Sequence, residues 1–349
     1  MNRRTKSTLI VKKNSLTRIR GICVLLVIFA HLLPYLEDSR IDYDNYGNSG
    51  VIGFFTLSSY LICSVLFNKT FSYKRFIIRR LIRIYPLFVI NFIIFTLAIN
   101  LFIRNEKDYY GFLSFDMFDW FLLIGNYSVN DGSPFGHLWS VCVEMHFYLC
   151  LPLFSLITNK NRNILLVFLI IFSCLINFYS VNALEVHNVW KLTTSHLGSF
   201  CIGALLAANE KTFKKFIYSR EVLIIFIPVV AYLANNRFTY LGSLSGIYYL
   251  VLSLMYALII LLGLQHPTKK YSFLHYLGER SYSIYLTHFT VIYIFMSQYK
   301  SDTSIPLRGA TLQQVTLCFI IIFLVGSLEF FIFERKILNF KTKVDYINY

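Results

Sequence analysis

Charged residues are scarce in this chain of 349 residues: Asp, Glu, Lys and Arg make up 15% of it, against about 25% in a soluble domain. With 16 Gly and 7 Pro, the chain has too few of either for a collagen-like or low-complexity protein. Residues of the hydrophobic set AVILMFWYC reach 56% instead. Because this leaves too little polar surface to cover a soluble globule, the composition predicts a membrane-embedded protein.

Cysteines are also few, and no two of them have the C-x-x-C spacing of a redox or zinc motif. All seven lie in apolar segments, so we interpret them as small apolar residues. No cluster of His, Asp, Glu and Cys has the spacing of a ligand set either. The sequence therefore predicts neither disulfides nor a metal site.

Long apolar runs make up most of the chain. A transmembrane helix needs about 20 mostly apolar residues. Ten segments are candidates: 18–36, 50–67, 84–103, 137–157, 164–181, 192–208, 222–235, 243–264, 276–296 and 311–333. We interpret the apolar segment 112–129, which carries Asp116 and Asp119, as re-entrant or interfacial. We expect an all-α polytopic membrane protein with about ten transmembrane helices around a central polar cavity.

The positive charges are distributed unevenly between these spans. With the N-terminus in the cytoplasm, 25 of the 33 Lys and Arg residues fall on the cytoplasmic side, as the positive-inside rule requires. We therefore expect an N-in and C-in orientation, with 1–17 and 335–349 as short basic cytoplasmic tails. This orientation accounts for the net charge of +15 without a nucleic-acid partner. A single membrane-embedded domain over 1–349 is expected.

Ionisable side chains inside apolar spans mark candidate sites, because each costs roughly 2.5–3.5 kcal/mol on insertion scales. Arg20 and His31 are eleven residues apart in the first span. On a helix they lie within about 20° of one another and about 16 Å apart along the axis. A snorkelling arginine and a structural histidine would explain each residue alone, whereas a shared polar cavity would explain both.

A basic run follows the second span. It contains Lys69, Lys74, Arg75, Arg79, Arg80 and Arg83. Spacings of three and four residues allow the last three guanidinium groups to converge on one polyanion. A positive-inside segment that contacts anionic lipid is an equal alternative. We expect Pro86 to bend or start a helix at this point.

Two further spans carry polar stripes. In the fourth span, His137 and Glu144 are seven residues apart and share a helix face, with Ser140 between them and Tyr148 one turn beyond. A glutamate at this depth favours a polar cavity or a cation. In the ninth span the spacing i, i+4, i+7 relates Ser281, Tyr285 and His288. A packed Tyr–Ser core is the alternative interpretation of this second stripe.

The segments that carry these residues resemble the bacterial acyltransferase-3 family of integral-membrane O-acyltransferases. Arg20 and His31 match its Arg-x10-His signature. The other similar segments are GVIGFFTLSSYLI (50–62), YKRFIIRRLIRIYP (73–86), GHLWSVCVEMHFYL (136–149), LGERSYSIYLTH (277–288) and FERKI (333–337). The resemblance covers nearly the whole chain, in order. The chain departs from the family's frequent residues at Ile52, Ser59, Met145, His196 and Gly198.

This resemblance implies transfer of an acyl group, usually acetyl, from cytoplasmic acyl-CoA to a hydroxyl of a cell-surface or lipid-linked glycan. It places the protein in the bacterial cytoplasmic membrane, with membrane lipid as a further partner. It implies no bound cofactor, since acetyl-CoA or another acyl-CoA is a co-substrate. Some relatives carry a C-terminal esterase-like domain, which is not expected here. Whether the chain forms a homo-oligomer stays open.

The resemblance and the stripes together assign expected roles. We expect His31 to be the general base that deprotonates the acceptor hydroxyl, and Glu144 to orient His31 or that hydroxyl. An acyl-His31 intermediate is the open alternative. The donor phosphates are expected at Arg20, Arg75, Arg79, Arg80 and Arg83. The acceptor or the oxyanion is expected at His137, Ser140, Tyr148, Ser281, Tyr282, Tyr285 and His288.

Two other classes of function fit parts of the pattern. Many spans with buried His and Glu also suit a transporter or flippase for a glycan intermediate or a small anion. The absence of a clear internal repeat in the sequence weighs against this class. A membrane sensor or scaffold would not require ionisable residues aligned on polar stripes.

Overall fold

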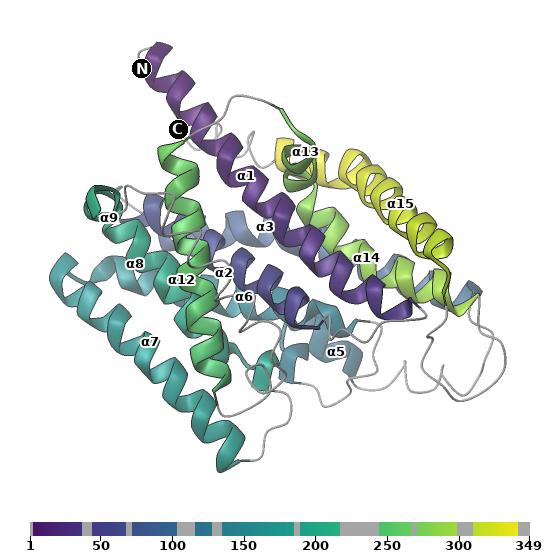
Figure 1. The fold of residues 1–349 in the computed structure, drawn as a ribbon, viewed down its shortest axis with the longest axis horizontal. Coiled ribbons are helices and arrows are strands. Elements are labelled where there is room, and N and C mark those ends of the chain that lie inside the picture. The colour runs from purple at the N-terminus through teal and green to yellow at the C-terminus, as the bar shows by residue number, and fades with distance from the viewer. Residues whose placement is uncertain are drawn as a thin grey trace. The chain divides into compact units, whose positions relative to one another are not determined.

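The computed structural model of the protein describes residues 3–36, 44–67, 72–102, 116–127, 135–184, 189–216, 244–266, 271–298 and 310–340. Within these ranges every regular element is a helix (Figure 1). The β contact in this part of the chain is an isolated bridge between Leu36 and Ala310. The expected all-α class is confirmed.

The longer helices are α1 (Arg3–Leu32), α2 (Asp44–Leu66), α3 (Tyr73–Phe102), α7 (Asn159–Asn182), α12 (Ser245–Gln265), α14 (Ser281–Ser297) and α15 (Leu312–Glu329). The shorter ones are α5 (Asp116–Phe121), α6 (Trp139–Cys150), α8 (Leu197–Ala208), α9 (Glu210–Phe216) and α13 (Phe273–Glu279). Short 3-10 helices are η1 (Leu33–Tyr35), η2 (Gly125–Tyr127), η3 (Gly136–Leu138), η4 (Leu151–Leu156), η5 (Val189–Lys191) and η6 (Thr193–His196). A π-helical turn, η7 (Phe330–Glu334), follows α15.

Among the described residues, six helices are long and apolar enough to cross a membrane: Asn14–Tyr35, Gly47–Leu66, Tyr73–Ala98, Lys160–Asn182, Ser245–Gln265 and Leu312–Phe340. They overlap the expected spans 18–36, 50–67, 84–103, 164–181, 243–264 and 311–333, and they make this a multi-pass membrane protein. The expected span 222–235 lies outside the described residues. The N-in and C-in orientation stays a prediction.

The other three expected spans are not continuous α-helices. Segment 137–157 is divided among η3, the 12-residue α6 and η4, where Pro152 has no backbone N–H to extend the α-helical ladder. Segment 192–208 is divided between η6 and the short α8. Segment 276–296 is interrupted at Arg280, whose φ of −103° and ψ of 6° leave the helical region. At these breaks the structure has two or more short helices where the apolar pattern of the sequence predicted one continuous span.

The basic run is helical and starts earlier than expected. α3 begins at Tyr73, and Pro86 lies inside it instead of starting it. A proline removes one donor from the ladder, but the helix continues on both sides of it. The arginines of the run therefore occupy the first turns of a membrane helix. At the other end of the chain, α-helix resumes after η7 and reaches Phe340, so part of the expected tail 335–349 is helical.

Contacts group the chain into two compact units that alternate along the sequence. Unit 1 comprises Met1–Val27, Asp44–Phe71 and Leu149–Glu279. Unit 2 comprises Ile28–Tyr43, Ser72–Tyr148 and Arg280–Tyr349. Each unit therefore depends on segments that are distant in sequence. The single domain expected over 1–349 stays a prediction.

In unit 1, α2 packs against α8 and α12, and α7 packs against the same two helices (Figure 1). A Cβ placed on Gly203 of α8 would lie 2.3 Å from the Thr56 carbonyl oxygen of α2, so glycine permits this close approach. The Ser59 hydroxyl donates across the same contact to the Phe200 carbonyl, at 2.5 Å. Close backbone packing thus holds this unit together.

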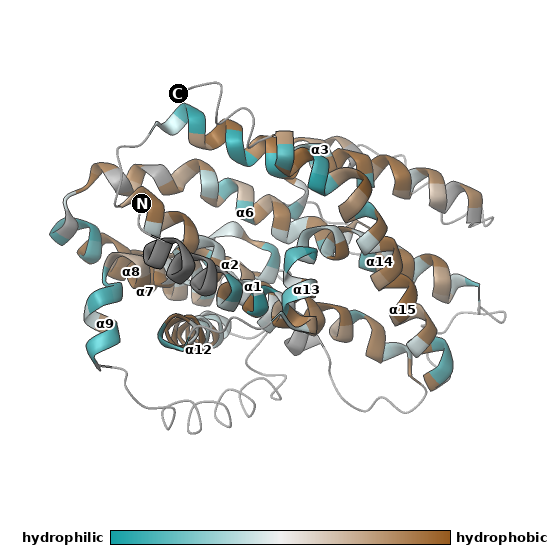
Figure 2. Ribbon diagram, turned by 90° about the horizontal axis from the view of Figure 1, so that it is seen from above, coloured by the Kyte–Doolittle hydropathy of each residue, from teal (hydrophilic) through white to brown (hydrophobic). Residues whose placement is uncertain are grey.

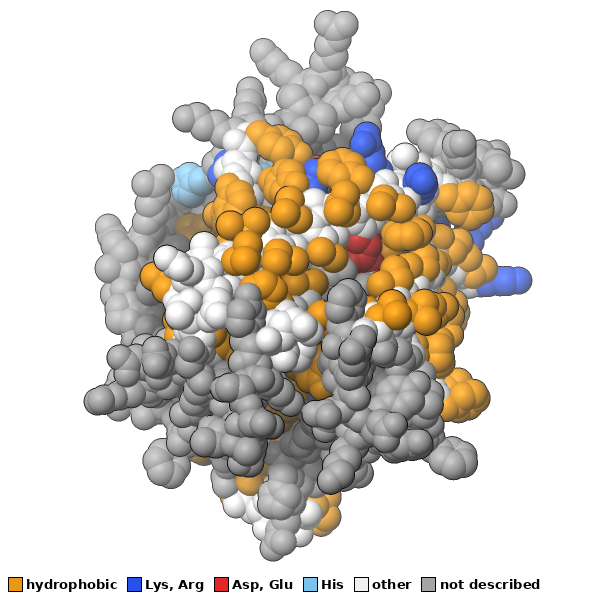
Figure 3. Space-filling view, turned by 90° about the vertical axis from the view of Figure 1, so that its right-hand side faces the viewer, with side chains coloured by type: hydrophobic (Ala, Val, Ile, Leu, Met, Phe, Trp, Pro, Cys, Tyr) orange, Lys and Arg blue, Asp and Glu red, His pale blue; other side chains and the backbone are white. Residues whose placement is uncertain are grey.

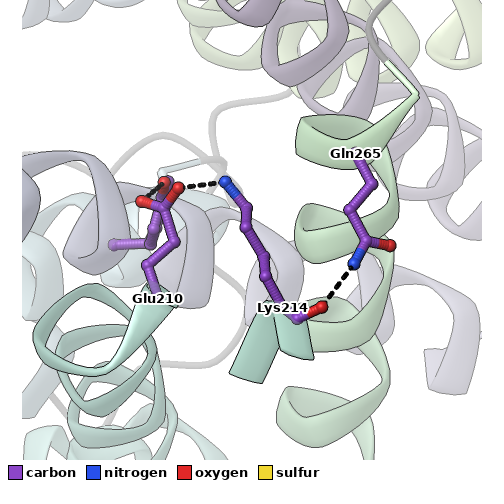
Figure 4. Close-up of polar contacts among 4 residues, drawn as sticks. Glu210, Lys214 and Gln265 are labelled. Atoms are coloured by element: carbon purple, nitrogen blue, oxygen red, sulfur yellow. Dashed lines mark hydrogen bonds and ion pairs between the residues drawn. The ribbon is translucent and has the colours of Figure 1, made fainter. Parts of the chain in front are cut away.

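A polar group joins the ends of three unit 1 helices. Figure 4 shows the ion pair between Glu210 and Lys214 of α9 and the 3.3 Å hydrogen bond from Gln265 of α12 to the Lys214 carbonyl. The Tyr60 hydroxyl of α2 donates to Glu210 at 2.8 Å. These contacts attach the short α9 to the ends of two apolar helices.

In unit 2, α14 packs against α15 and α3. The Tyr282 hydroxyl of α14 donates to the Ile84 carbonyl of α3 at 2.9 Å. A Cβ on Gly326 of α15 would lie 2.7 Å from Ile284 Cγ1 of α14, so small size matters at this contact too. These helices position the polar side chains of the candidate site.

Many exterior side chains are apolar, as expected of helices that face lipid. Figure 2 shows hydrophobic colouring along much of α7 and α15 and hydrophilic colouring on the short α9. Exposed apolar residues on α7 include Ile164, Val167, Phe168, Ile171, Phe172, Leu175 and Phe178. Figure 3 shows hydrophobic side chains gathered over one face, with Lys and Arg toward its upper and right-hand edges.

Candidate functional site

Three histidines from three different elements of unit 2 lie together. His31 is near the end of α1, His137 is in η3 and His288 is in α14. The ring centroid of His288 is 5.1 Å from that of His31 and 5.2 Å from that of His137. His288 is completely buried and His137 nearly so, whereas His31 is partly exposed. Residues of three separate sequence stripes thus form one histidine cluster.

Hydrogen bonds orient the three rings. The Nδ1 atom of His288 is 2.6 Å from the Tyr285 carbonyl oxygen, and its Nε2 atom is 3.3 Å from His31 Nδ1. The Nε2 atom of His137 is 3.2 Å from the Leu286 carbonyl oxygen. Because a carbonyl oxygen can only accept, His288 Nδ1 and His137 Nε2 both act as donors. The first turns of α14 therefore anchor two of the three imidazoles.

An aromatic ring and two hydroxyl groups pack around the histidine cluster. The Phe289 ring stacks on His137 at 5.1 Å and meets His31 edge to face at 5.3 Å. The Tyr285 hydroxyl donates to the His137 carbonyl at 2.7 Å. Its oxygen lies 2.6 Å from Ser140 Oγ, which accordingly donates. Of the residues expected at the acceptor or the oxyanion, His137, Ser140, Tyr285 and His288 lie together here.

Glu144 belongs to a second group, which links α6 to α3. The buried Tyr148 hydroxyl donates to the Glu144 carboxylate. The Arg80 guanidinium lies over the Tyr148 ring at 5.2 Å and over the Phe76 ring at 5.3 Å. Glu144 and Arg83 are both within Coulombic range of Arg80. The structure thus shows Tyr148 as the partner of Glu144, and His288 as the partner of His31.

The expected donor residues on α3 form a basic helical face. Arg75 is exposed, while Arg79, Arg80 and Arg83 are partly buried. Arg79 and Arg83 are four residues apart on this continuous helix and so share one side of it. The ring stacking of Arg80 holds one member of the run in place. The first turns of α3 thus carry an ordered run of arginines.

Two other expected residues belong to α1 and to the start of α14. Arg20 is partly exposed and falls in unit 1, on the unbroken helix α1 that also carries His31. The expected helical spacing of this pair therefore exists. Ser281 is buried as the first residue of α14. In the described part of the chain, no group of three or more His, Cys, Asp or Glu could hold a metal ion.

Sequence reasoning missed a pair of buried polar residues in unit 2. Asn91 of α3 donates to the Glu329 carboxylate of α15, and both side chains are buried. Five residues on, the buried Glu334 accepts from the hydroxyl and, at 3.3 Å, from the backbone N–H of Ser283. The turn between the two glutamates is the π-helical η7, a feature frequent at functional sites. The sequence feature that could have revealed this pair is Glu329 itself, a glutamate inside the apolar run LVGSLEFF.

The comparisons with known proteins agree with the predicted resemblance. The family model described as "Acyltransferase domain" matches residues 13–330. A protein named "Putative O-acetyltransferase" from Staphylococcus aureus strain COL is 28% identical over 325 residues, which cover 82% of this chain and 52% of that protein. "O-acetyltransferase OatA" of Staphylococcus aureus strain NCTC 8325 is 26% identical over the same shares of the two chains.

The chain spans about half the length of the curated relatives that it matches. No solved structure gives a significant match. The family match begins before Arg20 and ends after His288, so it includes both residues of the Arg-x10-His signature and the whole histidine cluster. Because the family model covers most of its length, the chain belongs to the acyltransferase-3 family.

Proposed function

We propose that the protein is a membrane O-acyltransferase, which moves an acyl group from cytoplasmic acyl-CoA to a hydroxyl of a cell-surface or lipid-linked glycan. Membership of the acyltransferase-3 family and relatives named O-acetyltransferases support this proposal. They also favour acetyl as the group transferred. The observation that carries the proposal is the histidine cluster, in which the signature residue His31 hydrogen-bonds a fully buried second imidazole.

In the proposed reaction, His31 is the general base. It takes the proton of the acceptor hydroxyl while the hydroxyl oxygen bonds to the thioester carbonyl carbon. The carbon–sulfur bond then breaks, and the CoA sulfur takes the proton back from His31. The imidazole ends the cycle as it began, neutral, which suits a site surrounded by aromatic rings and helix carbonyls.

The donor is proposed to bind at the basic face of α3. Arg75, Arg79, Arg80 and Arg83 would hold the phosphates of the acyl-CoA by charge-assisted hydrogen bonds. Arg20 stays a candidate for the same role on the strength of the signature. Glu144 and Tyr148 would position Arg80, since the hydroxyl of Tyr148 bonds Glu144 and its ring lies against the guanidinium.

The acceptor is proposed to approach the histidine cluster. His137, Ser140 and Tyr285 are connected there by hydrogen bonds of 2.6 to 2.7 Å that involve two hydroxyls and one backbone carbonyl. Hydroxyl and imidazole groups of this kind can orient a glycan hydroxyl or donate to the oxyanion of the tetrahedral intermediate. Tyr282 and Ser281, from the same turn of α14, are proposed as neighbouring contacts.

The test is acyl transfer by purified protein in proteoliposomes. We expect radiolabel from acetyl-CoA to appear in glycan extracted from a strain that lacks this chain, with stoichiometric release of CoA. The variant His31→Ala should lower the rate about 100-fold to 10,000-fold, the usual contribution of a general base. The exposed His266 serves as the matched control, and His266→Ala should transfer at the normal rate.

A transporter or flippase predicts a different outcome in the same vesicles. Glycan or anion would cross the bilayer without release of CoA, and no label would reach the glycan. Normal transfer by His31→Ala, at a normal level of folded protein, would reject the role of His31 while leaving the enzymatic activity itself in place.

A further inference from the structure

His288 has a defined tautomer in this structure. Its Nδ1 atom lies 2.6 Å from the Tyr285 carbonyl oxygen, and a carbonyl oxygen accepts but never donates. The hydrogen of a neutral His288 therefore resides on Nδ1. Its lone pair is consequently on Nε2, the atom that faces His31 Nδ1 at 3.3 Å.

The tautomer of His288 determines the tautomer of His31. A hydrogen bond between two nitrogens requires one donor and one acceptor. With His288 Nε2 as the acceptor, His31 Nδ1 must carry its hydrogen and donate it. The lone pair of His31 then resides on Nε2, on the opposite side of the ring.

The reverse arrangement requires a charged His288, with hydrogens on both nitrogens. His288 is completely buried. Among the described residues, the titratable groups against it are two further imidazoles, His31 and His137, and the hydroxyl of Tyr285 on its own helix. None of these supplies a negative charge at neutral pH, and a buried unpaired cation carries a large desolvation cost. The neutral form therefore fits this position.

We propose that His288 is the positioning residue of His31: it holds the His31 ring and its tautomer so that Nε2 is the atom that accepts the hydroxyl proton. This rests on the proposed acyltransferase function and refines it. His288 was expected on the acceptor side of the site, and here it acts through His31 instead. The Tyr285 carbonyl is the fixed point that orients both rings.

The proton balance of the step is complete within this pair. When His31 Nε2 takes the hydroxyl proton, the bond from His31 Nδ1–H to His288 Nε2 becomes charge-assisted and stronger. His288 stays neutral throughout. The proton then leaves His31 Nε2 for the CoA sulfur as the carbon–sulfur bond breaks. A neutral imidazole thus fills the orienting place that a carboxylate fills in a Ser-His-Asp triad.

Two substitutions at position 288 separate this role from simple packing. The amide oxygen of His288→Gln can accept from His31 Nδ1, whereas His288→Leu fills a similar space and cannot accept. We expect kcat for acetyl transfer to fall about 100-fold or more in His288→Leu, and less than about tenfold in His288→Gln. The KM for acetyl-CoA should stay unchanged in both, because the donor site is on α3.

The matched control lies on the same helix. Thr290 is buried, and its hydroxyl has no hydrogen-bond partner among the described residues, so Thr290→Val should transfer at the normal rate. Equal activity of His288→Leu and wild type would overturn the proposal. So would equal losses in His288→Leu and His288→Gln when folded protein is present at wild-type levels. Both results leave the acyltransferase function standing.

A spectroscopic measurement tests the tautomer without any turnover. In protein labelled with 15N-histidine, the His31 signals are identified as those lost in His31→Ala. We expect the shifts of an imidazole protonated at Nδ1, and their loss or averaging in His288→Leu. Protonation of a neutral His31 at Nε2 would refute the proposal. Failure of the acyltransferase function would instead appear as an inactive wild type with the expected His31 shifts.

Discussion

The two units satisfy their buried polar side chains in different ways. In unit 1 the partner is often a backbone carbonyl: His196 bonds the Trp190 carbonyl at 2.7 Å and Ser59 the Phe200 carbonyl at 2.5 Å. In unit 2 the His137 and His288 imidazoles also bond backbone carbonyls, but ionisable groups there contact one another or other side chains as well. His31 meets His288, and Glu144 accepts from Tyr148.

This difference leads us to expect the chemistry in unit 2. A polar side chain that bonds a backbone carbonyl completes the local hydrogen bonding and favours one packing arrangement. Ionisable side chains that pair inside apolar helices carry a cost without adding helical structure, and they mark functional positions by default. We therefore expect buried polar substitutions to lower mainly the stability in unit 1 and mainly the activity in unit 2.

The largest effect on stability is expected for His196→Ala. The His196 ring lies between Phe55 and Tyr249, with centroid distances of 5.1 and 4.9 Å, and the side chain is completely buried. Truncation leaves a cavity and should cost about 2–5 kcal/mol. The thermal midpoint, measured by size-exclusion chromatography after heating, should fall, while acetyl transfer per folded molecule stays normal. Low activity of His196→Ala at a normal thermal midpoint would contradict the expectation that buried polar residues of unit 1 affect mainly stability.

In unit 2 we expect Tyr148→Phe to lower activity at nearly constant stability. The change removes the hydrogen bond to Glu144 and keeps the ring that Arg80 covers. Without this hydrogen bond Glu144 and Arg80 are less firmly positioned, so the initial rate should fall about tenfold, which corresponds to about 1.4 kcal/mol of transition-state stabilisation. Tyr85→Phe is the control. The Tyr85 hydroxyl bonds the Phe121 carbonyl at 3.2 Å, so this substitution also removes a tyrosine hydrogen bond, but it should leave the rate unchanged.

A smaller effect is expected where α8 meets α2. The Cβ of Gly203→Ala would overlap the Thr56 carbonyl and should cost about 1–3 kcal/mol through overpacking. Gly263→Ala in α12 is matched to it, since the nearest atom to that Cβ is 3.6 Å away. It should be neutral, or stabilising because alanine has the higher helix propensity. Equal thermal midpoints for the two variants would show that the close packing of unit 1 contributes little.

The smallest effect is expected for Lys214→Met at the polar group of Figure 4. The Glu210 and Lys214 side chains are 27% and 24% exposed, so water and salt screen the pair. Its loss should change stability by only about 0.3–0.5 kcal/mol. The wild-type midpoint should approach that of the variant as salt is raised. A fall of several degrees with no salt dependence would mean that this pair acts as a buried one.

Prediction from the sequence succeeded where a feature is local. Apolar runs located the six long helices, and the Arg20–His31 spacing requires only an unbroken helix, which α1 is. It failed where a helix is interrupted by the backbone conformation of a single residue, as at Arg280 between α13 and α14. It also could not choose the partner of Glu144, since a helical stripe gives the direction of a side chain but not what lies opposite.

By itself, the sequence determined that this protein is embedded in a membrane, that it belongs to the acyltransferase-3 family, and which ionisable side chains lie within apolar segments. The tertiary structure alone decided which of them meet. His31 and His288 are 257 positions apart, so their contact depends on how α14 packs against the other helices of unit 2. The physical reason is range: hydrophobicity and helical period act over a few residues, whereas a hydrogen bond between two helices requires the packing of whole elements.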